Sequence, residues 1–373
     1  MRFIDVCLLN LVSRPLRTLL TLLGIAVATG SFFALVGASR GFERACLGSL
    51  NDRGTHVVGV RKGVVDFLSG SIDQKVGDRI REFDGVAEVA VELLDVAVLE
   101  PEETVLISGW RPAEYIWRTV RLRSGAMPSG GEADGIVIGE ATAEALGKKV
   151  GDTVTIRDRE FRISGVSQYG GAMNRTVVVM NLATMQKLME REGKVTFLNL
   201  RLREPQDSAA LERLREQAAG PFPYLKFCDT GEIVENDQFL RLFRATTRST
   251  SFIALFMGLV VILNTLMMSV TERTYDIGVL SAIGWQPRRI LSMILVEGVL
   301  LAVVGTGLGL LLGLGLLEFL SGLPQVRGFL EPEITTALLV EVSAAALTMG
   351  IVGSIYPAWR AVRLNPVDAL RRE

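Results

Sequence analysis

The sequence has few of the residues on which enzymes and metalloproteins commonly depend. Histidine occurs once, at His56, and the three cysteines, Cys7, Cys46 and Cys228, show no Cys-x-x-Cys spacing. A single histidine disfavours acid–base catalysis by imidazole and any histidine-rich metal site, and the cysteine spacing disfavours metal or redox chemistry. We therefore expect a chain that is not an enzyme, with no catalytic residues, no metal site and no cofactor of its own.

An excess of charge of either sign is also missing. The chain carries 40 Lys and Arg against 41 Asp and Glu, a formal net charge of −1. This balance argues against nucleic-acid binding, which usually requires a basic excess. The sequence contains no Gly-x-x-x-x-Gly-Lys-Ser/Thr phosphate loop. We therefore expect the chain not to hydrolyse ATP by itself, so that ATP and magnesium would bind to a partner ATPase subunit.

Four long windows are almost free of charge. They are residues 18–39, 249–271, 290–317 and 334–359. At 1.5 Å per residue the first window is roughly 33 Å long, enough to cross a hydrocarbon core of ~30 Å. A signal peptide is the alternative for this window, but its apolar stretch is longer than the usual 7–15 residues. Four such windows in one chain predict an α-helical membrane protein with four transmembrane helices.

Basic residues near the ends of these windows predict the orientation of the chain. They gather in residues 1–17, 272–289 and 360–373, whereas the short loop 318–333 holds a single arginine. We therefore expect both termini and the 272–289 loop in the cytoplasm, and the 318–333 loop outside. The long stretch 40–248 is then extracytoplasmic, because long domains translocate whatever their charge.

Alternating apolar patterns predict that this extracytoplasmic stretch is a large α+β domain. The predicted strands are residues 57–60, 86–91, 104–109, 195–202 and 224–228, and the predicted helices are residues 73–83 and 207–218. A β-rich stretch of about 110–190 lies inside it, with strands at 135–139, 151–157 and 161–168 and a hairpin turn near Asp158. We predict two subdomains, the second inserted in the first. Whether Cys46 and Cys228 form a disulfide there stays open.

The segments that join this domain to the membrane are predicted to be helical. Residues 40–50 continue the first apolar window with no breaker other than Gly41, and residues 232–248 carry apolar side chains at roughly helical spacing. An amphipathic helix that runs directly into a spanning helix would form a stiff stalk, which is the interpretation that we favour. The alternative is that these residues pack against the underside of the domain.

The third window is rich in glycine and contains one acid. Gly305, Gly309 and Gly313 form two overlapping small-x-x-x-small patterns, which allow close helix approach in lipid, within the bundle or across a dimer. Glu297, and Glu341 in the fourth window, are costly inside a bilayer. Each lies about two helical turns from a flanking charge. They either pack near a membrane interface or line an ion or substrate pathway.

The segment between the second and third windows carries the most specific signal. It reads Glu272-Arg-Thr-Tyr-Asp-Ile-Gly-Val-Leu-Ser-Ala-Ile-Gly-Trp-Gln-Pro-Arg-Arg289. Ile277, Leu280 and Ile283 are predicted to lie on one face of a short helix, which Gly284 ends before Pro287 starts the next helix. Such a helix at the membrane surface can carry force from a soluble motor. The alternative, an inert connector, would need only a few polar residues.

This segment resembles the signature loop of the FtsX-like, MacB-type permeases of ABC transporters, which typically reads Glu-Arg-x-x-Glu-Ile-Gly-x-Leu-x-Ala-Ile-Gly-Ala. Asp276 replaces the usual second glutamate, and Trp285 replaces the usual small residue. The tail, residues 356–373, residues 11–20 and residues 135–152 are also similar to this family, which includes lipoprotein-release, macrolide-exporter and DevC-like permeases. The resemblance implies that the following residues couple the chain to an ATPase: Glu272, Arg273, Asp276, Ile277, Gly278, Leu280, Ala282, Ile283 and Gly284.

The resemblance also implies partners and a mechanism. Two permease chains, identical or paralogous, would each dock on an ATPase subunit at the inner membrane of a bacterial cell, with residues 1–17 as a cytoplasmic amphipathic helix. ATP binding would shift the 273–285 helix, and the stalks would pass this motion to the external domains and drive export or extraction of a substrate. A periplasmic adaptor or outer-membrane partner could join this assembly. The alternative is an FtsX-like signalling complex that regulates an extracytoplasmic enzyme and moves no substrate.

Overall fold

The computed structural model divides the chain into two compact units. It describes residues 14–64, 68–100, 103–129, 134–169, 171, 173–236, 238–323 and 332–364. The helical unit takes in residues 1–39, 245–319 and 332–373, and the sheet unit takes in residues 40–244 and 320–331. The predicted helix 1–17, the loop 318–333 and the tail 360–373 lie largely outside the described residues, as does Cys7.

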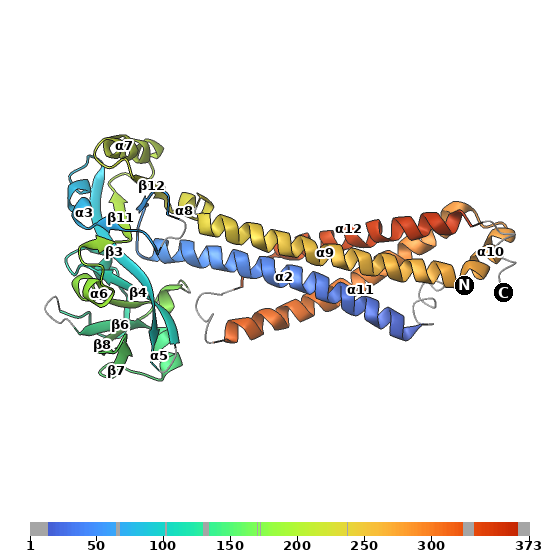
Figure 1. The fold of residues 1–373 in the computed structure, drawn as a ribbon, viewed down its shortest axis with the longest axis horizontal. Coiled ribbons are helices and arrows are strands. Elements are labelled where there is room, and N and C mark those ends of the chain that lie inside the picture. The colour runs from blue at the N-terminus through green and yellow to red at the C-terminus, as the bar shows by residue number, and fades with distance from the viewer. Residues whose placement is uncertain are drawn as a thin grey trace. The chain divides into compact units, whose positions relative to one another are not determined.

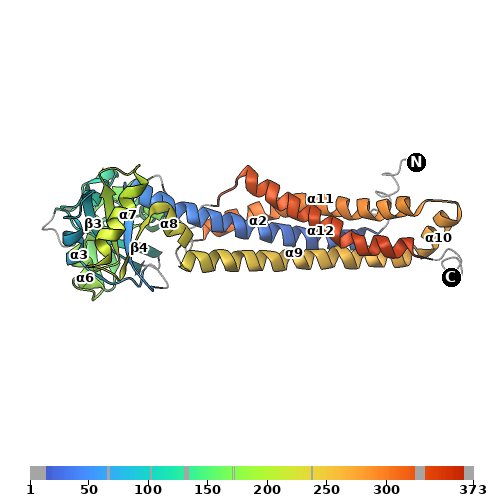
Figure 2. The ribbon, with the colours of Figure 1, turned by 90° about the horizontal axis from the view of Figure 1, so that it is seen from above.

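Four long helices supply the helical unit. They are α2 (Pro15–Asp52), α9 (Gln238–Glu272), α11 (Pro287–Gly322) and α12 (Thr336–Val362). Each is long and apolar enough to cross a membrane, which confirms the prediction of four apolar helices. Figures 1 and 2 show them running alongside one another, with the short helix α10 (Thr274–Ala282) between α9 and α11. Residues 40–52 of α2 and 238–244 of α9 belong to the sheet unit.

Local sequence explains where several of these helices begin. Proline is the first residue of both α2 and α11, where its missing N–H costs no intrahelical hydrogen bond. The Thr335 hydroxyl caps α12 by accepting a hydrogen bond from the Leu338 N–H at 3.3 Å. The core between the helices is apolar and includes Ile25, Ile262 and Leu301.

Small residues let α11 and α12 approach closely. A Cβ added at Gly350 of α12 would lie 2.5 Å from the Cβ of Ala302, and one added at Gly298 would lie 2.7 Å from the Cβ of Ser354. Such distances leave no room for a side chain. The glycines therefore permit close packing of the two backbones, which favours helix association in lipid.

The sheet unit is built on one ten-stranded sheet. Its order is β12–β1–β11–β3–β4–β9–β6–β8–β5, and β7 pairs with β3 and β8. The strands are β1 (Val57–Arg61), β3 (Val86–Leu99), β4 (Glu103–Trp110), β5 (Leu122–Gly125), β6 (Gly135–Gly139), β7 (Thr153–Ile156), β8 (Arg159–Ser167), β9 (Val178–Asn181), β11 (Phe197–Leu202) and β12 (Leu225–Asp229). A separate two-stranded sheet pairs β2 (Ile72–Asp73) with β10 (Lys194–Val195).

Short helices connect and cover these strands. They are α3 (Lys75–Ile80), α4 (Tyr115–Arg118), α5 (Glu140–Leu146), the 3₁₀ turn η1 (Met173–Arg175), α6 (Leu182–Leu188), α7 (Ser208–Ala219) and α8 (Thr230–Asn236). α3 packs on β3, α6 on β4 and α7 on β12. These three helices contribute to one apolar core, and α4 and the end of α2 contribute to the other. Along β3, for example, Val89, Val91 and Leu93 belong to one apolar core, and Ala90 and Leu94 to the other.

The predicted strands and helices of this unit are confirmed, with shifts of one to a few residues at their ends, except that β3 extends to Leu99. The hairpin near Asp158 is also present, because Arg157 and Asp158 have φ of 46° and 62° and join β7 to β8. The expected division into two subdomains is not confirmed. Strand β9 pairs in parallel with β4, and this pairing joins the β-rich insertion to the rest of the sheet. Cys46 and Cys228 form no disulfide with each other.

Candidate functional site

The helix α10 has the ends that its sequence predicts. It runs from Thr274 to Ala282, and Gly284 follows with φ of +96°, a conformation that glycine adopts without strain. α11 then begins at Pro287. The segment between the second and third apolar helices is therefore a short rigid helix and not a flexible connector.

Glu272 ties the start of this segment to α2. Its carboxylate accepts a hydrogen bond from Arg17 at 2.6 Å and also pairs with Arg14. Both arginines lie at the N-terminal end of α2. Arg17 and Glu272 are 255 residues apart in the sequence. Hydrogen bonds between ionised partners are stronger than neutral ones. The end of α9 is therefore held to the beginning of α2.

The next residue, Arg273, ties the segment to α11. Its guanidinium donates to Oε1 of Glu297 at 3.0 Å, and the Glu297 side chain is only 4% exposed. The residue that sequence reasoning left undecided between packing and a transport pathway is thus an ion-pair partner of the loop. The removal of one member would leave the other charge buried without its partner. Glu341 of α12, by contrast, is exposed.

The two sides of α10 differ in exposure. Ile277 and Gly278 are buried, and Ile277 packs in the apolar core with residues of α9 and α11. Asp276 is exposed, and the large apolar side chains of Tyr275 and Ile283 are 55% and 73% exposed. The helix therefore has one side that belongs to the bundle core and another side on which Tyr275 and Asp276 are exposed.

The prediction that Ile283 shares a face with Ile277 and Leu280 is wrong. At 3.6 residues per turn, each three-residue step turns back by about 60°, so two steps place Ile283 about 120° away from Ile277. Ile283 also follows the last residue of α10. Leu280 is half-buried, Ala282 and Gly284 are exposed, and Trp285 packs at the edge of the core.

The three predicted packing glycines face α2 of the same chain. A Cβ at Gly305 would lie 2.7 Å from Cβ of Ile25, and one at Gly309 would lie 2.8 Å from the carbonyl oxygen of Ala26. One at Gly313 would lie 2.9 Å from the carbonyl oxygen of Gly30. The glycines thus form a stripe along which the backbones of α11 and α2 cross closely.

Sequence reasoning missed the charged partners of this site. Arg14 and Arg17 served only to orient the chain, and nothing in a single sequence links Arg273 to Glu297, 24 residues away. It also missed a buried pair in the sheet unit, where Arg53 donates to Glu92 at 2.7 Å. One signal was present, because Glu92 is an acid in the apolar run Val89-Ala-Val-Glu-Leu-Leu94. Among the described residues, no cluster of His, Cys, Asp and Glu is arranged to hold a metal ion.

Comparison with known families matches nearly the whole chain. The family of the MacB-like periplasmic core domain matches residues 18–217, and the family of the FtsX-like permease C-terminal domain matches residues 248–366. The first match alone covers more than half of the 373 residues. The second contains α10 and the pair of Arg273 with Glu297, whereas Arg14 and Arg17, the partners of Glu272, precede both matches.

Curated relatives show the same pattern. An uncharacterized ABC transporter permease of Methanocaldococcus jannaschii is 31% identical over 249 residues, which cover 64% of this chain and 62% of the relative. The macrolide export ATP-binding/permease protein MacB of Agrobacterium fabrum is 28% identical over 97% of this chain and 59% of its own length. The lipoprotein-releasing system transmembrane protein LolC of Xylella fastidiosa is 27% identical over 64% of this chain and 65% of the relative. The chain spans about three fifths of the length of these relatives.

Proposed function

Because the chain belongs to the family of permeases with a MacB-like periplasmic core domain and an FtsX-like C-terminal domain, we propose that it is the membrane subunit of an ABC transporter. A separate subunit would bind ATP and magnesium and hydrolyse the ATP. This chain would pass the resulting motion to its sheet unit, which would drive the export or extraction of a substrate. The chain itself would catalyse no reaction.

The observation that carries this proposal is the construction of α10. The side of α10 that faces the bundle is held by Ile277, which packs in the core. The two residues before α10 also hold it, because Glu272 binds α2 and Arg273 binds α11. Its other side exposes Tyr275 and Asp276. Because α10 is attached to both α2 and α11, it would move together with these helices. Exposed apolar side chains are typical of the centre of a protein interface, and charged side chains are typical of its rim. We infer that an ATPase subunit binds this side.

The helices α2 and α9 would carry the motion. Each is a single helix whose residues fall in both units, since α2 ends at Asp52 and α9 begins at Gln238. A continuous helix resists bending better than a loop, so a shift at one end is passed along its length. This supports the interpretation of residues 40–50 as a stalk. In the second predicted stalk, residues 232–248, the helix is divided, because α8 ends at Asn236 and α9 begins at Gln238.

The assembly would contain two ATPase subunits and a second permease chain, identical or paralogous. The glycine stripe of α11 is occupied by α2 of the same chain, so the second permease would bind elsewhere on the helical unit. We place the complex in the bacterial inner membrane, with α10 and both termini in the cytoplasm and the sheet unit outside. A periplasmic adaptor or an outer-membrane partner would bind the sheet unit.

Affinity purification from native membranes tests the ATPase contact. We expect the chain to retain an ATP-binding subunit in stoichiometric amount, and the Asp276→Arg variant to lose it. Glu160→Arg is the matched control, because it makes the same change of charge at an exposed acid of the sheet unit. Retention of the ATPase by Asp276→Arg, or its equal loss from both variants, would contradict the assignment of α10. An ATPase complex that moves no substrate and instead activates an extracytoplasmic enzyme would support the FtsX-like signalling role.

A further inference from the structure

The sheet unit contains a cavity of about 290 Å³ that the proposed transport role does not use. Its walls come from the last turns of α2, from β1, β3, β4, β11 and β12, and from residues around α8 and the start of α9. This volume is close to the lower end of the ~300–1,000 Å³ typical of small-molecule sites. All of the lining residues belong to the sheet unit.

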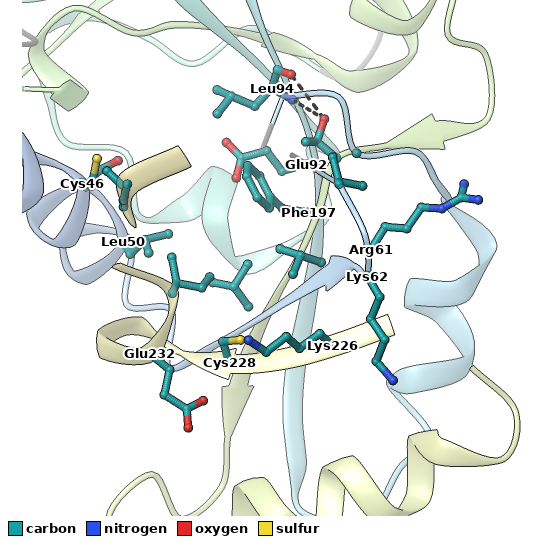
Figure 3. A pocket seen from close by; sticks show the side chains of 18 of the residues that line it. Cys46, Leu50, Arg61, Lys62, Glu92, Leu94, Phe197, Lys226, Cys228 and Glu232 are labelled. Atoms are coloured by element: carbon teal, nitrogen blue, oxygen red, sulfur yellow. Dashed lines mark hydrogen bonds between the residues drawn. The ribbon is translucent and has the colours of Figure 1, made fainter. Parts of the chain in front are cut away.

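Most of the wall is apolar. Figure 3 shows Leu50 reaching in from the helix, Phe197 from β11 and Cys228 from β12. The apolar lining is completed by Val58, Val60, Leu94, Leu106, Met173, Ile233 and Leu240. Such a surface favours the burial of a hydrocarbon group.

The two glutamates that line the cavity already form ion pairs with arginines. Glu92 accepts hydrogen bonds from Arg53 at 2.7 Å, Ser108 at 2.8 Å and Asn199 at 2.9 Å, and it is 1% exposed. Glu232 is paired with Arg215. A cationic ligand would therefore find no uncommitted carboxylate among the described lining residues.

One cation of the cavity keeps an unused donor, whereas Lys226 is hydrogen-bonded to the Cys228 thiol. Arg53 is 4% exposed and lines the cavity, and its buried Nε atom has no hydrogen-bond partner among the described residues. The side chain of Lys226 extends along β12 toward Cys228, so its ammonium group lies at the cavity wall. Burial raises the pKa of the Cys228 thiol, and the positive charge of Lys226 opposes this rise. Arg241 at the start of α9 is a further exposed cation of the lining.

We propose that this cavity binds a single-chain anionic amphiphile. Its hydrocarbon chain would lie against Leu50 and Phe197, and its carboxylate or phosphate would lie beside Lys226. Since Cys46, Ser49 and Leu50 of α2 line one wall, the occupant would contact the end of that helix directly. The inference does not depend on the transport function, because it rests on the lining of the sheet unit alone.

The test uses the full chain in lipid nanodiscs and a decanoate that carries a photoreactive diazirine at the end of its chain. Irradiation followed by peptide mass spectrometry should give adducts in residues 46–53 and on β11 or β12. Unlabelled decanoate should compete for these adducts. A photoreactive decylamine should label these peptides about tenfold less, because it meets Lys226 with a like charge. Labelling confined to the apolar helices of the helical unit, or equal labelling by the amine, would overturn the proposal.

Two pairs of variants locate the charged and the apolar contacts. Lys226→Glu should lower the labelling about tenfold, whereas Lys194→Glu, the same change at an exposed residue of β10 outside the lining, should leave it unchanged. Val60→Phe should fill part of the cavity and lower the labelling without a change of charge, whereas Val98→Phe, at a 56% exposed position of β3, should not. Equal labelling of all four variants would show that the probe binds elsewhere.

Discussion

A buried arginine–glutamate pair lies in each unit, and the two pairs differ in surroundings. In the sheet unit, the side chain of Arg53 is 5% and that of Glu92 1% exposed, and Glu92 accepts further hydrogen bonds from Asn199 and Ser108. In the helical unit, Arg273 is 18% exposed and pairs with Glu297, which is 4% exposed. The first pair fixes the end of α2 to the middle of a sheet, and the second fixes the start of α10 to α11. The Arg53–Glu92 pair thus stabilises the fold of the sheet unit, whereas the Arg273–Glu297 pair lies where we propose that motion enters the helical unit.

The largest effect is expected at the sheet pair. Glu92→Ala would leave Arg53 buried without its counter-charge, so we expect the free energy of unfolding to fall by about 3–5 kcal/mol. Glu88→Ala is the matched control on the same strand, because the Glu88 side chain is 38% exposed and its partners Arg118 and Arg201 are 66% and 28% exposed. The control should lose about 0–1 kcal/mol. Thermal unfolding followed by the near-UV signal of the tryptophans measures both, and equal losses would contradict the account.

A smaller effect is expected at the loop pair. Glu297→Gln keeps a hydrogen-bonding side chain but removes the charge that Arg273 contacts at 3.0 Å, so stability should fall by about 2 kcal/mol. Glu341→Gln, the same substitution at an exposed glutamate of α12, should change it by less than about 0.5 kcal/mol. Thermal unfolding of the purified chain in one detergent compares them. If Glu341→Gln proves the more harmful, the two glutamates have been assigned the wrong roles.

The glycine stripe of α11 (Gly305, Gly309 and Gly313) provides an uncharged contact, with α2, to compare with the two ion pairs. Gly309→Ala would place a methyl group against Thr29 and 2.8 Å from the carbonyl oxygen of Ala26, which should cost about 1–3 kcal/mol. Gly315→Ala lies in the same helix with open space around its Cβ, so it should be neutral or slightly stabilising. Thermal unfolding measures both, and a neutral Gly309→Ala would show that α2 and α11 do not pack as described.

The smallest effect concerns pH and the sheet unit. Burial raises the pKa of Glu114 to about 7, although the Val91 N–H and the nearby Arg111 and Arg81 act in the opposite direction. Because the folded-state pKa lies above the unfolded value, this carboxyl favours the folded state at low pH, and stability falls as pH rises through about 7. We expect a loss of about 1 kcal/mol between pH 6 and pH 8. Glu114→Gln should remove this part of the pH dependence, and an unchanged profile would contradict the assignment.

Features fixed by neighbouring residues were predictable from the sequence. The apolar windows gave the four helices, and Gly284 and Pro287 gave the boundaries of α10 and α11 because turn and cap chemistry is local. The prediction for Ile283 failed because a three-residue spacing drifts around a helix over two turns.

Features fixed by distant residues were not predictable. The parallel pairing of β4 with β9 joins Ile107 to Val178, and no local pattern reports it. For this reason the sequence did not predict that residues 110–190 share one sheet with the rest of the unit. The partners of Glu272, Arg273 and Glu92 were missed for the same reason, because each lies on another helix or strand.

The central claim is that motion enters at α10 and reaches the sheet unit. Its most direct test is the rate at which maleimide modifies Cys46 and Cys228, both in the sheet unit, when the membrane complex is trapped with magnesium-ATP and vanadate. The account predicts that trapping changes these rates, read site by site by mass spectrometry, and that Asp276→Arg abolishes the change while Glu160→Arg preserves it. Rates that trapping leaves unchanged, or a change that survives in Asp276→Arg, would contradict the account.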